Sequence, residues 1–317
     1  MNNQDWLCRA REAKRLALIA HVSPDGDTVG AVLALRLAFL SMGKAVDVIC
    51  DGDVPKDMRW IPGADAFIRP EHAGEYDTVI AVDVAEPRLL GSAKAVFDAA
   101  NVRMVIDHHA TNPHYGDVNE IRGDECSCCV LAYDVISALG VTLTVEMGTC
   151  LMLGLSTDTG HFQYPYTTPK ALRVGAALLE LGVDVSNMTR RLYRTSSRQR
   201  VAITRIAYQN MRFELDGRVG VIMLSQKDFE AAGCTPFETG GLVNLALEVE
   251  GVRMAILATE RGDEVKLSLR AVEPDTVNDI AGRFGGGGHA QAAGCSFACD
   301  MDDAVRQVLA AMEDKLG

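Results

Sequence analysis

The 317-residue sequence contains no uncharged apolar run of about 18 residues, the length that a membrane-spanning helix requires. It also lacks a small-residue cleavage site after its first apolar stretch, which acidic and basic residues precede. We therefore expect neither a membrane span nor a signal peptide. A cytoplasmic protein is the class that remains.

Cysteines at metal-ligand spacing are missing as well. The nine cysteines are an odd number in a chain without a secretory signal, which is typical of reduced thiols. The tightest group is Cys126, Cys128 and Cys129, and no second pair follows closely enough to complete a zinc site. We interpret these three as small buried thiols on a helix, in preference to a metal site.

The chain has no excess of positive charge. Its formal net charge is −12, which argues against a long polyanion lying across the whole surface. The same charge does not exclude a small phosphate ligand in one local pocket. Basic residues are concentrated in segment 186–212, which contains seven arginines and neither Asp nor Glu.

Short apolar runs alternate with amphipathic stretches in the first half of the chain. Four runs rich in β-branched residues are typical of buried strands, and these are 16–21, 45–51, 78–84 and 103–109. A helical pattern over 28–43 lies between the first two and closes at Gly43. This alternation predicts an α/β fold with an N-terminal, doubly wound, mostly parallel sheet.

Beyond the arginine-rich segment the pattern changes. Strands are predicted over 217–224, 252–260 and 263–272, followed by helical stretches near 275–284 and 301–315. The last two strands meet at Arg261–Asp263, which suits a hairpin turn. The predicted domains are an N-terminal domain over 1–185, a helical linker over 186–213 and a smaller α+β domain over 214–317.

Aspartate and histidine residues cluster where the predicted strands end. In chain order these residues are His21, Asp25, Asp27, Asp83, Asp107, His108, His109 and, at the end of a helical stretch, Asp158. Ligands of open parallel sheets collect outside the carboxyl ends of the strands, so one crevice could receive all of these side chains. Singly, each has another explanation, since Asp25 or Asp27 could cap the helix near Thr28.

Converging carboxylates without a cation would repel one another and become protonated, so the pattern favours a metal site. Mixed Asp and His ligands suit Mn²⁺ or Mg²⁺. The ligands are too many for one ion. Two ions about 3.5–4 Å apart, bridged by a shared aspartate, can activate water and neutralise a phosphoryl group. Phosphoester hydrolysis is the chemistry of such a site.

Five motifs resemble those of a known family. HVSPDGD, AVDV, DHH and STDTGHF, which begin at residues 21, 81, 107 and 156, resemble the successive signature motifs of the DHH phosphoesterase superfamily. GGGGHAQAAG, residues 285–294, is similar to the signature of the accompanying DHHA1 domain. The motifs cover nearly the whole chain, and their two-domain layout resembles the nano-RNase/pAp phosphatase branch.

The resemblance implies a role for each residue at the strand ends. One metal ion would be held by His21, Asp25 and Asp83. The other would be held by Asp27, Asp83, His108 and Asp158, so that Asp83 is the bridge. His109 would contact the scissile phosphate or its leaving oxygen, and Asp107 would orient the histidines. For Asp107, a hydrogen-bonded strand terminator and a direct ligand are equally open interpretations. Mn²⁺ is the expected ion, and the same ligands also serve Mg²⁺ or Co²⁺.

The glycine run at 285–288 lacks the Gly-Lys-Ser/Thr ending of a P-loop, which excludes an NTPase. Four glycines can form a mobile surface loop, or can expose backbone N–H groups to an anion if a helix follows and adds its dipole. The resemblance favours a site for the substrate's terminal phosphate or base. Its residues would be Gly286, Gly287, Gly288, His289 and Arg270.

The arginine-rich segment leaves two interpretations open, a solvated helix face or a contact with substrate phosphates. Arg190, Arg191 and Arg194 fall at one-turn spacing, and Arg191 and Arg194 are the candidates for that contact. The sequence departs from the family pattern at two places. Ala271 stands where relatives often have Ser, and the segment with Cys128 and Val130 stands where they commonly carry Ser/Thr and Glu.

The residues predict a two-metal phosphoesterase, and the resemblance implies that it releases 5′-mononucleotides from pApA or RNA of two to five nucleotides and that it dephosphorylates pAp. The acidic surface fits short substrates, because long strands need an extended basic track. A soluble cyclic di-AMP phosphodiesterase and a catalytically inactive nucleotide-binding sensor are the alternatives, although the intact ligand set speaks against the sensor. The oligomeric state stays open between a monomer and a homodimer.

Overall fold

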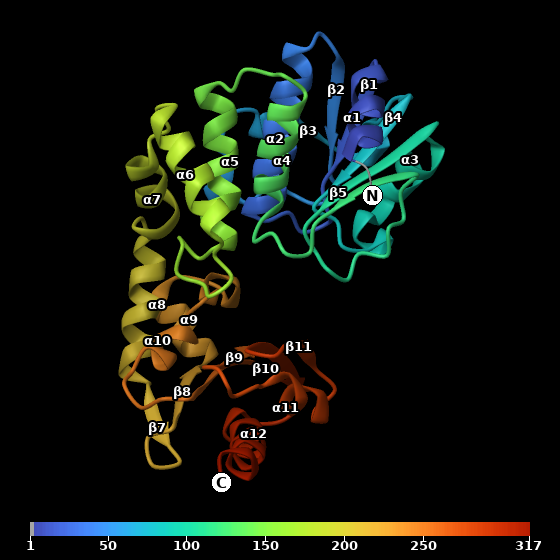
Figure 1. Cartoon of the computed structure of the whole chain (residues 1–317). Coiled ribbons are helices and arrows are strands. Elements are labelled where there is room, and N and C mark those ends of the chain that lie inside the picture. The colour runs from blue at the N-terminus through green and yellow to red at the C-terminus, as the bar shows by residue number, and fades with distance from the viewer. Residues whose placement is uncertain (1–2) are drawn as a thin grey trace. The chain divides into compact units, whose positions relative to one another are not determined.

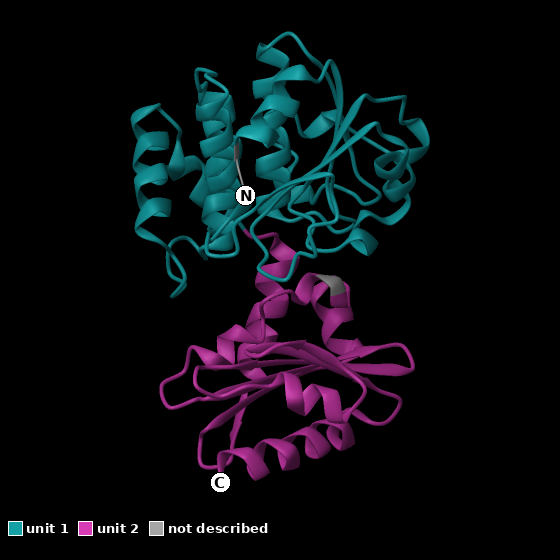
Figure 2. Cartoon of the chain, turned by 45° about the vertical axis from the view of Figure 1, so that its right-hand side comes forward, with its two compact units in different colours: residues 1–195 teal, residues 196–317 magenta. Residues whose placement is uncertain are grey.

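The computed structural model describes the backbone of residues 3–317, with the side chains of residues 4–236 and 238–317. The chain divides into two compact units, residues 1–195 and 196–317, which are coloured separately in Figure 2. Within the described residues, no helix combines the length and the apolar character needed to cross a membrane. Each unit is built around its own sheet and its own hydrophobic core.

The described part of unit 1 contains six strands that pair in parallel throughout, in the order β3-β2-β1-β4-β5-β6 (Figure 1). The strands are β1 (Arg15–Ile19), β2 (Ala45–Ile49), β3 (Phe67–Ile68), β4 (Thr78–Val82), β5 (Val102–Asp107) and β6 (Val118–Ile121). The predicted parallel sheet is therefore confirmed. The strand order reverses between β1 and β4, and such a switch point opens a crevice at the carboxyl ends of the strands.

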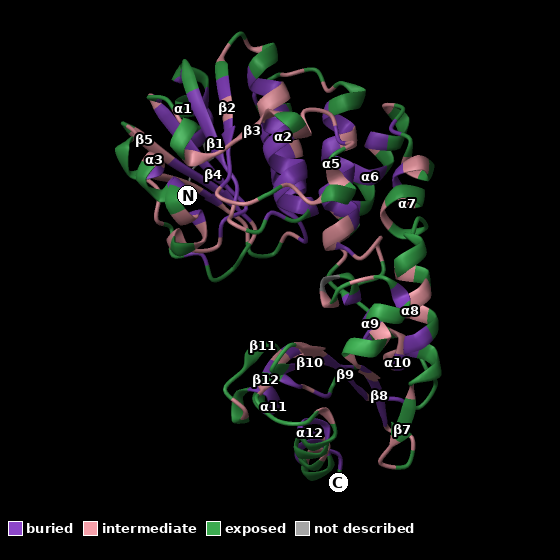
Figure 3. Cartoon of the chain, turned by 180° about the vertical axis from the view of Figure 1, so that it is seen from behind, coloured by how far each residue is buried: buried purple, intermediate pink, exposed green. Residues whose placement is uncertain are grey.

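Helices pack against both faces of this sheet. They are α1 (Asn3–Glu12), α2 (Gly26–Ser41), α3 (Lys94–Ala99), α4 (Cys128–Ala138), α5 (Val145–Asp158), α6 (Pro169–Glu180) and α7 (Val185–Tyr193), with 3-10 turns η1 (Lys56–Met58), η2 (Ala64–Ala66), η3 (Pro70–His72) and η4 (Pro87–Ala93). Leu16 and Leu18 of β1 pack in the core that includes α2, α4 and α5, whereas Ala17 and Ile19 pack with η4 and α3. Figure 3 shows α2 buried along most of its length, which explains why its sequence is apolar all round.

Glycines allow α2 and α5 to approach closely. A Cβ atom on Gly30 would lie 2.3 Å from the carbonyl oxygen of Cys150, and one on Gly154 would lie 2.5 Å from Oδ1 of Asp27. Both distances are too short for a side chain, so only glycine fits at these positions. The close approach places Asp27, in the first turn of α2, near the end of α5 at Asp158.

Unit 2 contains a mixed six-stranded sheet in the order β11-β12-β10-β9-β8-β7. The strands are β7 (Arg212–Glu214), β8 (Val219–Leu224), β9 (Met254–Arg261), β10 (Glu264–Ala271), β11 (Gly287–His289) and β12 (Ala292–Phe297), and the helices are α8 (Arg198–Gln209), α9 (Gln226–Ala232), α10 (Asn244–Leu247), α11 (Asn278–Arg283) and α12 (Met301–Leu316), with the 3-10 turn η5 (Pro236–Thr239). Only β8 and β9 pair in parallel. The predicted hairpin is confirmed, because Arg261 pairs with Glu264 across a two-residue turn.

The arginine-rich segment is divided between the two units. Met188 of α7 is buried in the core of unit 1, whereas Ile203 and Ile206 of α8 are buried in unit 2. Arg200 donates hydrogen bonds to the carbonyl oxygens of Glu238 and Gly240 and so holds α8 against η5. Part of the basic character of this segment therefore stabilises local structure.

The glycine run forms the first strand of a hairpin. α11 ends immediately before it, and Gly287–His289 pairs with β12. A pair of strands, and not a helix, follows the start of the run, so no helix dipole is directed from that side toward an anion. A Cβ on Gly286 would lie 2.1 Å from the carbonyl oxygen of Gly294, and Gly288 has φ +145°. Gly286 and Gly288 are thus required by the close approach of two strands.

Candidate metal centre

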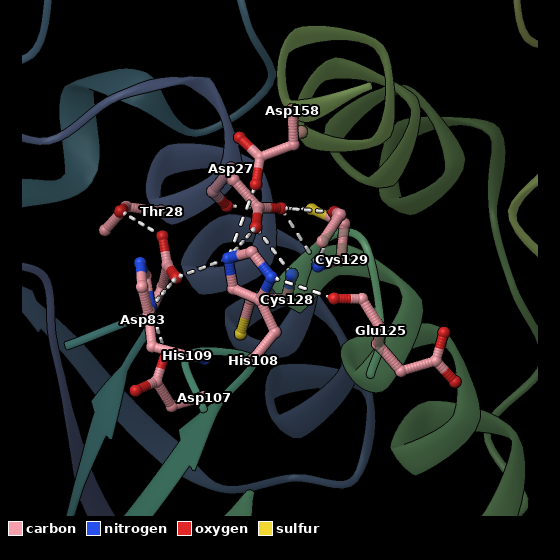
Figure 4. A network of polar contacts seen from close by, with 12 residues as sticks. Asp27, Thr28, Asp83, Asp107, His108, His109, Glu125, Cys128, Cys129 and Asp158 are labelled. Atoms are coloured by element: carbon pink, nitrogen blue, oxygen red, sulfur yellow. Dashed lines mark hydrogen bonds and ion pairs between the residues drawn. The ribbon is translucent and has the colours of Figure 1, made fainter. Parts of the chain in front are cut away.

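Side chains from four segments of unit 1 meet at the carboxyl edge of its sheet, and Figure 4 shows several of them directed at one another. Their ligand atoms form three groups, each within 4.8 Å, which are His21, Asp25 and Asp83; Asp83, His108 and His109; and Asp27, His108 and Asp158. The structure thus brings together all six residues proposed as metal ligands. A cavity of about 750 Å³ opens onto the cluster.

Asp83 lies at the centre of the cluster and is almost fully buried. Its Oδ2 accepts a hydrogen bond from the Thr28 hydroxyl at 2.6 Å, whereas its Oδ1 is buried and no described residue donates a hydrogen bond to it. The residue also has a positive φ of 58°, an unfavourable conformation for a side chain other than glycine. A buried carboxylate oxygen that lacks a hydrogen-bond donor is a feature that a bound cation would explain.

Asp25 and Asp27 have different roles at the start of α2. Oδ1 of Asp25 accepts hydrogen bonds from the amides of Asp27 and Thr28, so the capping interpretation is correct for this residue. The cap uses one oxygen and is compatible with a ligand role for the other. The buried Asp27 carboxylate accepts hydrogen bonds from the Ser127 hydroxyl at 2.6 Å and from the Cys129 amide at 3.0 Å. It therefore lies at the N-terminus of α4, where negative charge is favoured.

His108 is held by the backbone. Its Nδ1 lies 3.1 Å from the carbonyl oxygen of Glu125, which requires the proton to be on Nδ1. Its Nε2 then faces Asp158 at 3.4 Å, Asp83 at 3.5 Å and Asp27 at 3.7 Å. A neutral ring that donates through one nitrogen to a carbonyl group and presents the other is the usual arrangement of a metal-binding histidine.

His109 pairs with Asp107, the buried residue at the end of β5. The two side chains approach to 2.7 Å through Nδ1 and Oδ1, and Oδ2 of Asp107 accepts a hydrogen bond from Asn112 at 2.6 Å. Asp107 therefore orients His109, whereas Glu125 holds His108. The hydrogen bond to Asp107 raises the pKa of His109, although burial opposes it, so His109 is more readily protonated than an ordinary histidine.

The carboxylates of the cluster destabilise one another electrostatically. Burial, together with Asp27 and Asp25, raises the pKa of Asp83 well above its usual range. Burial, together with Asp27 and Asp83, raises the pKa of Asp158 to about 11. Divalent cations remove this repulsion, so the unpaired oxygen of Asp83 and the oxygen-rich donor set both fit hard metal ions.

The three clustered cysteines are buried, as predicted. Cys128 and Cys129 begin α4, and burial raises the pKa of both thiols, so they remain protonated and inert. Cys126 precedes the helix and lines the cavity. None of these thiols belongs to the candidate metal groups within the described part of the chain.

Lys170, at the start of α6, fixes the loop that holds His108. Its ammonium group forms ion pairs with Glu125 and with Asp134, the latter at 2.6 Å. The Glu125 carboxylate is largely buried and points away from His108, while its backbone carbonyl accepts the His108 hydrogen bond (Figure 4). Sequence analysis missed this pair, because no local pattern connects residues 45 positions apart.

We expect Lys170→Met to weaken binding of a divalent cation about tenfold, because supporting contacts of metal ligands typically contribute 10–100-fold to affinity. Calorimetric titration with Mn²⁺ measures the change. Lys170→Arg should retain most of the affinity. Lys94→Met is the matched control, since it removes the exposed Lys94–Asp98 ion pair of α3. An unchanged Mn²⁺ affinity in Lys170→Met would refute the positioning role.

The candidate substrate residues of unit 2 occupy one face of its sheet. Arg270 pairs with Ala292, and Ala292 pairs with His289, so the three residues form one row across β10, β12 and β11. Directly paired residues project to the same face, and the small Ala292 leaves space between the two larger side chains. The row thus places Arg270 and His289 as neighbours on one surface.

A hollow of about 380 Å³ lies beside the glycine run in unit 2. Its lining includes Gly286, Gly287 and Lys266, but neither Gly288 nor His289. Lys266 lies two register positions from Ser268 and four from Arg270 on the same face of β10, so it adds a positive charge there. The sequence analysis did not select Lys266, because an alternating strand carries a lysine on its solvent face by default.

The two arginines proposed from the linker lie outside the metal cavity. The Arg191 guanidinium lies 5.0 Å from the centre of the Trp60 ring and also contacts Asn187 at 3.2 Å. Arg194 is the C-cap of α7. Neither residue lines the cavity of the metal centre. The structure therefore gives Arg191 a packing role within unit 1.

Two family models and several named proteins match the sequence of this chain. Residues 15–155 match the model described as DHH family, N-terminal domain, and residues 218–317 match that of the DHHA1 domain. The chain is 32% identical over 303 residues to a Thermus thermophilus protein named bifunctional oligoribonuclease and PAP phosphatase NrnA, covering 94% of this chain and 89% of that one. A Bacillus subtilis protein of the same name is 25% identical, with coverage of 94% and 93%.

The fold has a close counterpart among solved structures. The crystal structure of an exopolyphosphatase-related protein from Bacteroides fragilis superposes with a TM-score of 0.90 at 25% identity, covering 98% of this chain and 95% of that one. The two family models match one compact unit each, the DHH model in unit 1 and the DHHA1 model in unit 2. The chain therefore belongs to the DHH family and carries a DHHA1 domain.

Proposed function

We propose that this protein is a two-metal phosphoesterase that hydrolyses short nucleotides. Its substrates are RNA of two to five nucleotides and pApA, which yield 5′-mononucleotides, and pAp, which yields AMP. The observation that supports it most directly is the buried Oδ1 of Asp83, which receives no hydrogen bond from the described residues, in a residue that belongs to two of the three groups of ligand atoms. The oligoribonuclease and PAP phosphatase names of the relatives support the choice of substrate class.

Two divalent cations, for which we propose Mn²⁺, would neutralise the phosphoryl oxygens and lower the pKa of the attacking water. His21 and Asp25 would hold one ion, Asp27, His108 and Asp158 the other, and Asp83 both. His109 is positioned by Asp107 and has a raised pKa, so it can donate a proton to the leaving oxygen.

Unit 2 supplies substrate binding in this proposal. Arg270 and His289 would contact the terminal phosphate or base, with the backbone of Gly286, Gly287 and Gly288 beside them. We expect His289→Ala to raise KM for pApA about tenfold with little change in kcat, because binding is lost without loss of the reacting groups. A small artificial phosphodiester should be hydrolysed as before. Equal losses on both substrates would show that His289 does not act through nucleotide binding.

A substrate panel with added Mn²⁺ tests the proposed function. It contains pApA, RNA of graded length, pAp, cyclic di-AMP and pyrophosphate, and each substrate is also tested with Asp83→Ala to exclude a contaminating phosphatase. We expect fast release of 5′-mononucleotide from the shortest RNAs and phosphate release from pAp. Turnover of cyclic di-AMP or pyrophosphate alone would keep the metal chemistry but overturn the substrate assignment. No turnover despite bound metal would favour a nucleotide sensor.

A further inference from the structure

Two exposed tyrosines lie at the cavity of the metal centre and have no part in the chemistry described above. Tyr164 is 48% exposed and Tyr166 is 57% exposed, and both line the cavity together with His109 and Asp158. Their ring centres are 5.5 Å apart and the planes are tilted by 41°. Only 6% of the chain is aromatic, so two accessible rings beside the candidate ligands require an explanation.

The loop that carries these rings, residues 159–168, is held at both ends. It begins after Asp158, the last residue of α5, and ends at Thr168, whose hydroxyl caps α6. Within it, the Tyr164 amide donates to the Thr159 carbonyl oxygen at 3.0 Å, and the Thr167 amide donates to the Tyr164 carbonyl oxygen at 3.0 Å. The tyrosines are therefore positioned by the same segment that delivers Asp158.

Backbone conformation further defines the place of Tyr164. Gly160, His161 and Phe162 are consecutive residues with φ of 56°, 59° and 66°, an unusual run that turns the loop sharply. A Cβ on Gly160 would lie 2.5 Å from the Tyr164 ring, so the ring packs directly on the glycine backbone. The contact covers one part of the ring and leaves the remainder accessible, as its exposure shows.

We propose that Tyr164 and Tyr166 form a stacking platform for the nucleobase next to the scissile phosphate. The inference rests on the proposed function, because the metal centre places the phosphate in this cavity. An aromatic face binds any of the four bases, since every base has a π face, and it needs no positive charge. This suits a cavity that is lined by carboxylates. The platform would give affinity for nucleotides over other phosphoesters without selecting a base.

The first test compares kinetics on substrates with and without the base. We expect the Tyr164→Ala/Tyr166→Ala double variant to raise KM for pApA tenfold to hundredfold, the equivalent of about 1–3 kcal/mol, with kcat within a few-fold. Its KM for an analogue that lacks this one base should match that of the wild type. The Tyr164→Phe/Tyr166→Phe variant keeps the rings and should behave as wild type on both. Leu172→Ala, which removes another exposed side chain of unit 1 outside the cavity lining, is the control.

The second test needs no turnover and so separates this proposal from the proposed function. Binding of AMP and of ribose 5-phosphate is measured by calorimetry, and stacking is followed by the fluorescence of 2-aminopurine riboside 5′-phosphate. We expect at least tenfold tighter binding of AMP and quenched fluorescence in the wild type and the Phe variant, with both effects lost in the Ala variant. If AMP binding and quenching follow this pattern but no nucleotide is hydrolysed, the proposed function is refuted and the stacking platform is supported. Equal binding of both ligands by the wild type, or unchanged quenching in the Ala variant, would overturn the platform.

Discussion

Asp83→Ala is expected to lower kcat/KM on pApA by roughly 10³-fold or more, which corresponds to at least about 4 kcal/mol of transition-state stabilisation. The reason is that Asp83 belongs both to the group with His21 and Asp25 and to the group with His108 and His109, and in the proposed centre it would hold both ions, so its loss would weaken both. The measurement is steady-state turnover, combined with the metal content of the purified variant.

Asp83→Asn separates the loss of ligand charge from a loss of folding. The amide has the shape of the carboxyl group and can retain the contact with Thr28, but it removes a buried acid whose neighbours disfavour its charge. We therefore expect the metal-free variant to unfold at the same or a higher temperature than the metal-free wild type, although it is inactive. Asp117→Ala, at the exposed Arg103–Asp117 pair, is the matched control and should remain active. More than a tenth of wild-type activity in Asp83→Ala would exclude the bridging role.

Removal of divalent cations by a chelator is expected to abolish turnover and to lower the melting temperature at neutral pH by about 5 °C or more. A ligand at 100 times its Kd stabilises the folded state by about 2.7 kcal/mol, and each kcal/mol corresponds to about 2–4 °C in a protein of this size class. Readdition of Mn²⁺ should restore both activity and stability. A melting temperature that does not respond to Mn²⁺, with activity unaffected by the chelator, would rule out the metal centre.

The pH dependence of this stabilisation follows from the raised carboxyl pKa values. Folding raises the pKa of Asp158 from 3.8 to about 11, so this group stabilises the metal-free folded protein at low pH and the contribution is lost as pH rises between those values. A bound cation takes the place of the proton on the Asp158 carboxyl group, so it stabilises the folded protein most where that proton is lost. We therefore expect the increase in melting temperature on adding Mn²⁺ to be larger at pH 8 than at pH 6. Calorimetry in two buffers of different ionisation enthalpy should show proton release on metal binding. A larger Mn²⁺ effect at pH 6 would contradict this account.

The sequence was informative about the metal centre because its residues are local to recognisable strand ends. His21, Asp83 and His108 each follow an apolar run, and parallel strands bring their carboxyl ends to one edge. The motif resemblance supplied the assignment to two metal ions, which stays a prediction, and the structure brings the six proposed ligands into three groups of neighbouring ligand atoms. The functional class could be predicted on the same basis.

The second unit was less predictable. The hairpin of β9 and β10 has a local turn signal at Gly262, and it was predicted correctly. The glycine run at 285–288 carries no apolar periodicity, so the sequence could not show that it pairs with β12. Without that pairing, the row that joins Arg270 to His289 could not be inferred either.

By itself, the sequence determined the parallel sheet, the set of acidic and histidine residues at its edge, and the family to which they belong. The tertiary structure alone decided how those residues are held. It showed that Glu125 and Lys170 support His108, that Asp107 orients His109, and that Tyr164 and Tyr166 line the cavity. The physical reason is the separation along the chain of the residues that interact. Strand ends and motifs depend on neighbours in the chain, whereas hydrogen bonds across many residues, close helix approaches and strand pairing depend on the packing of the whole unit.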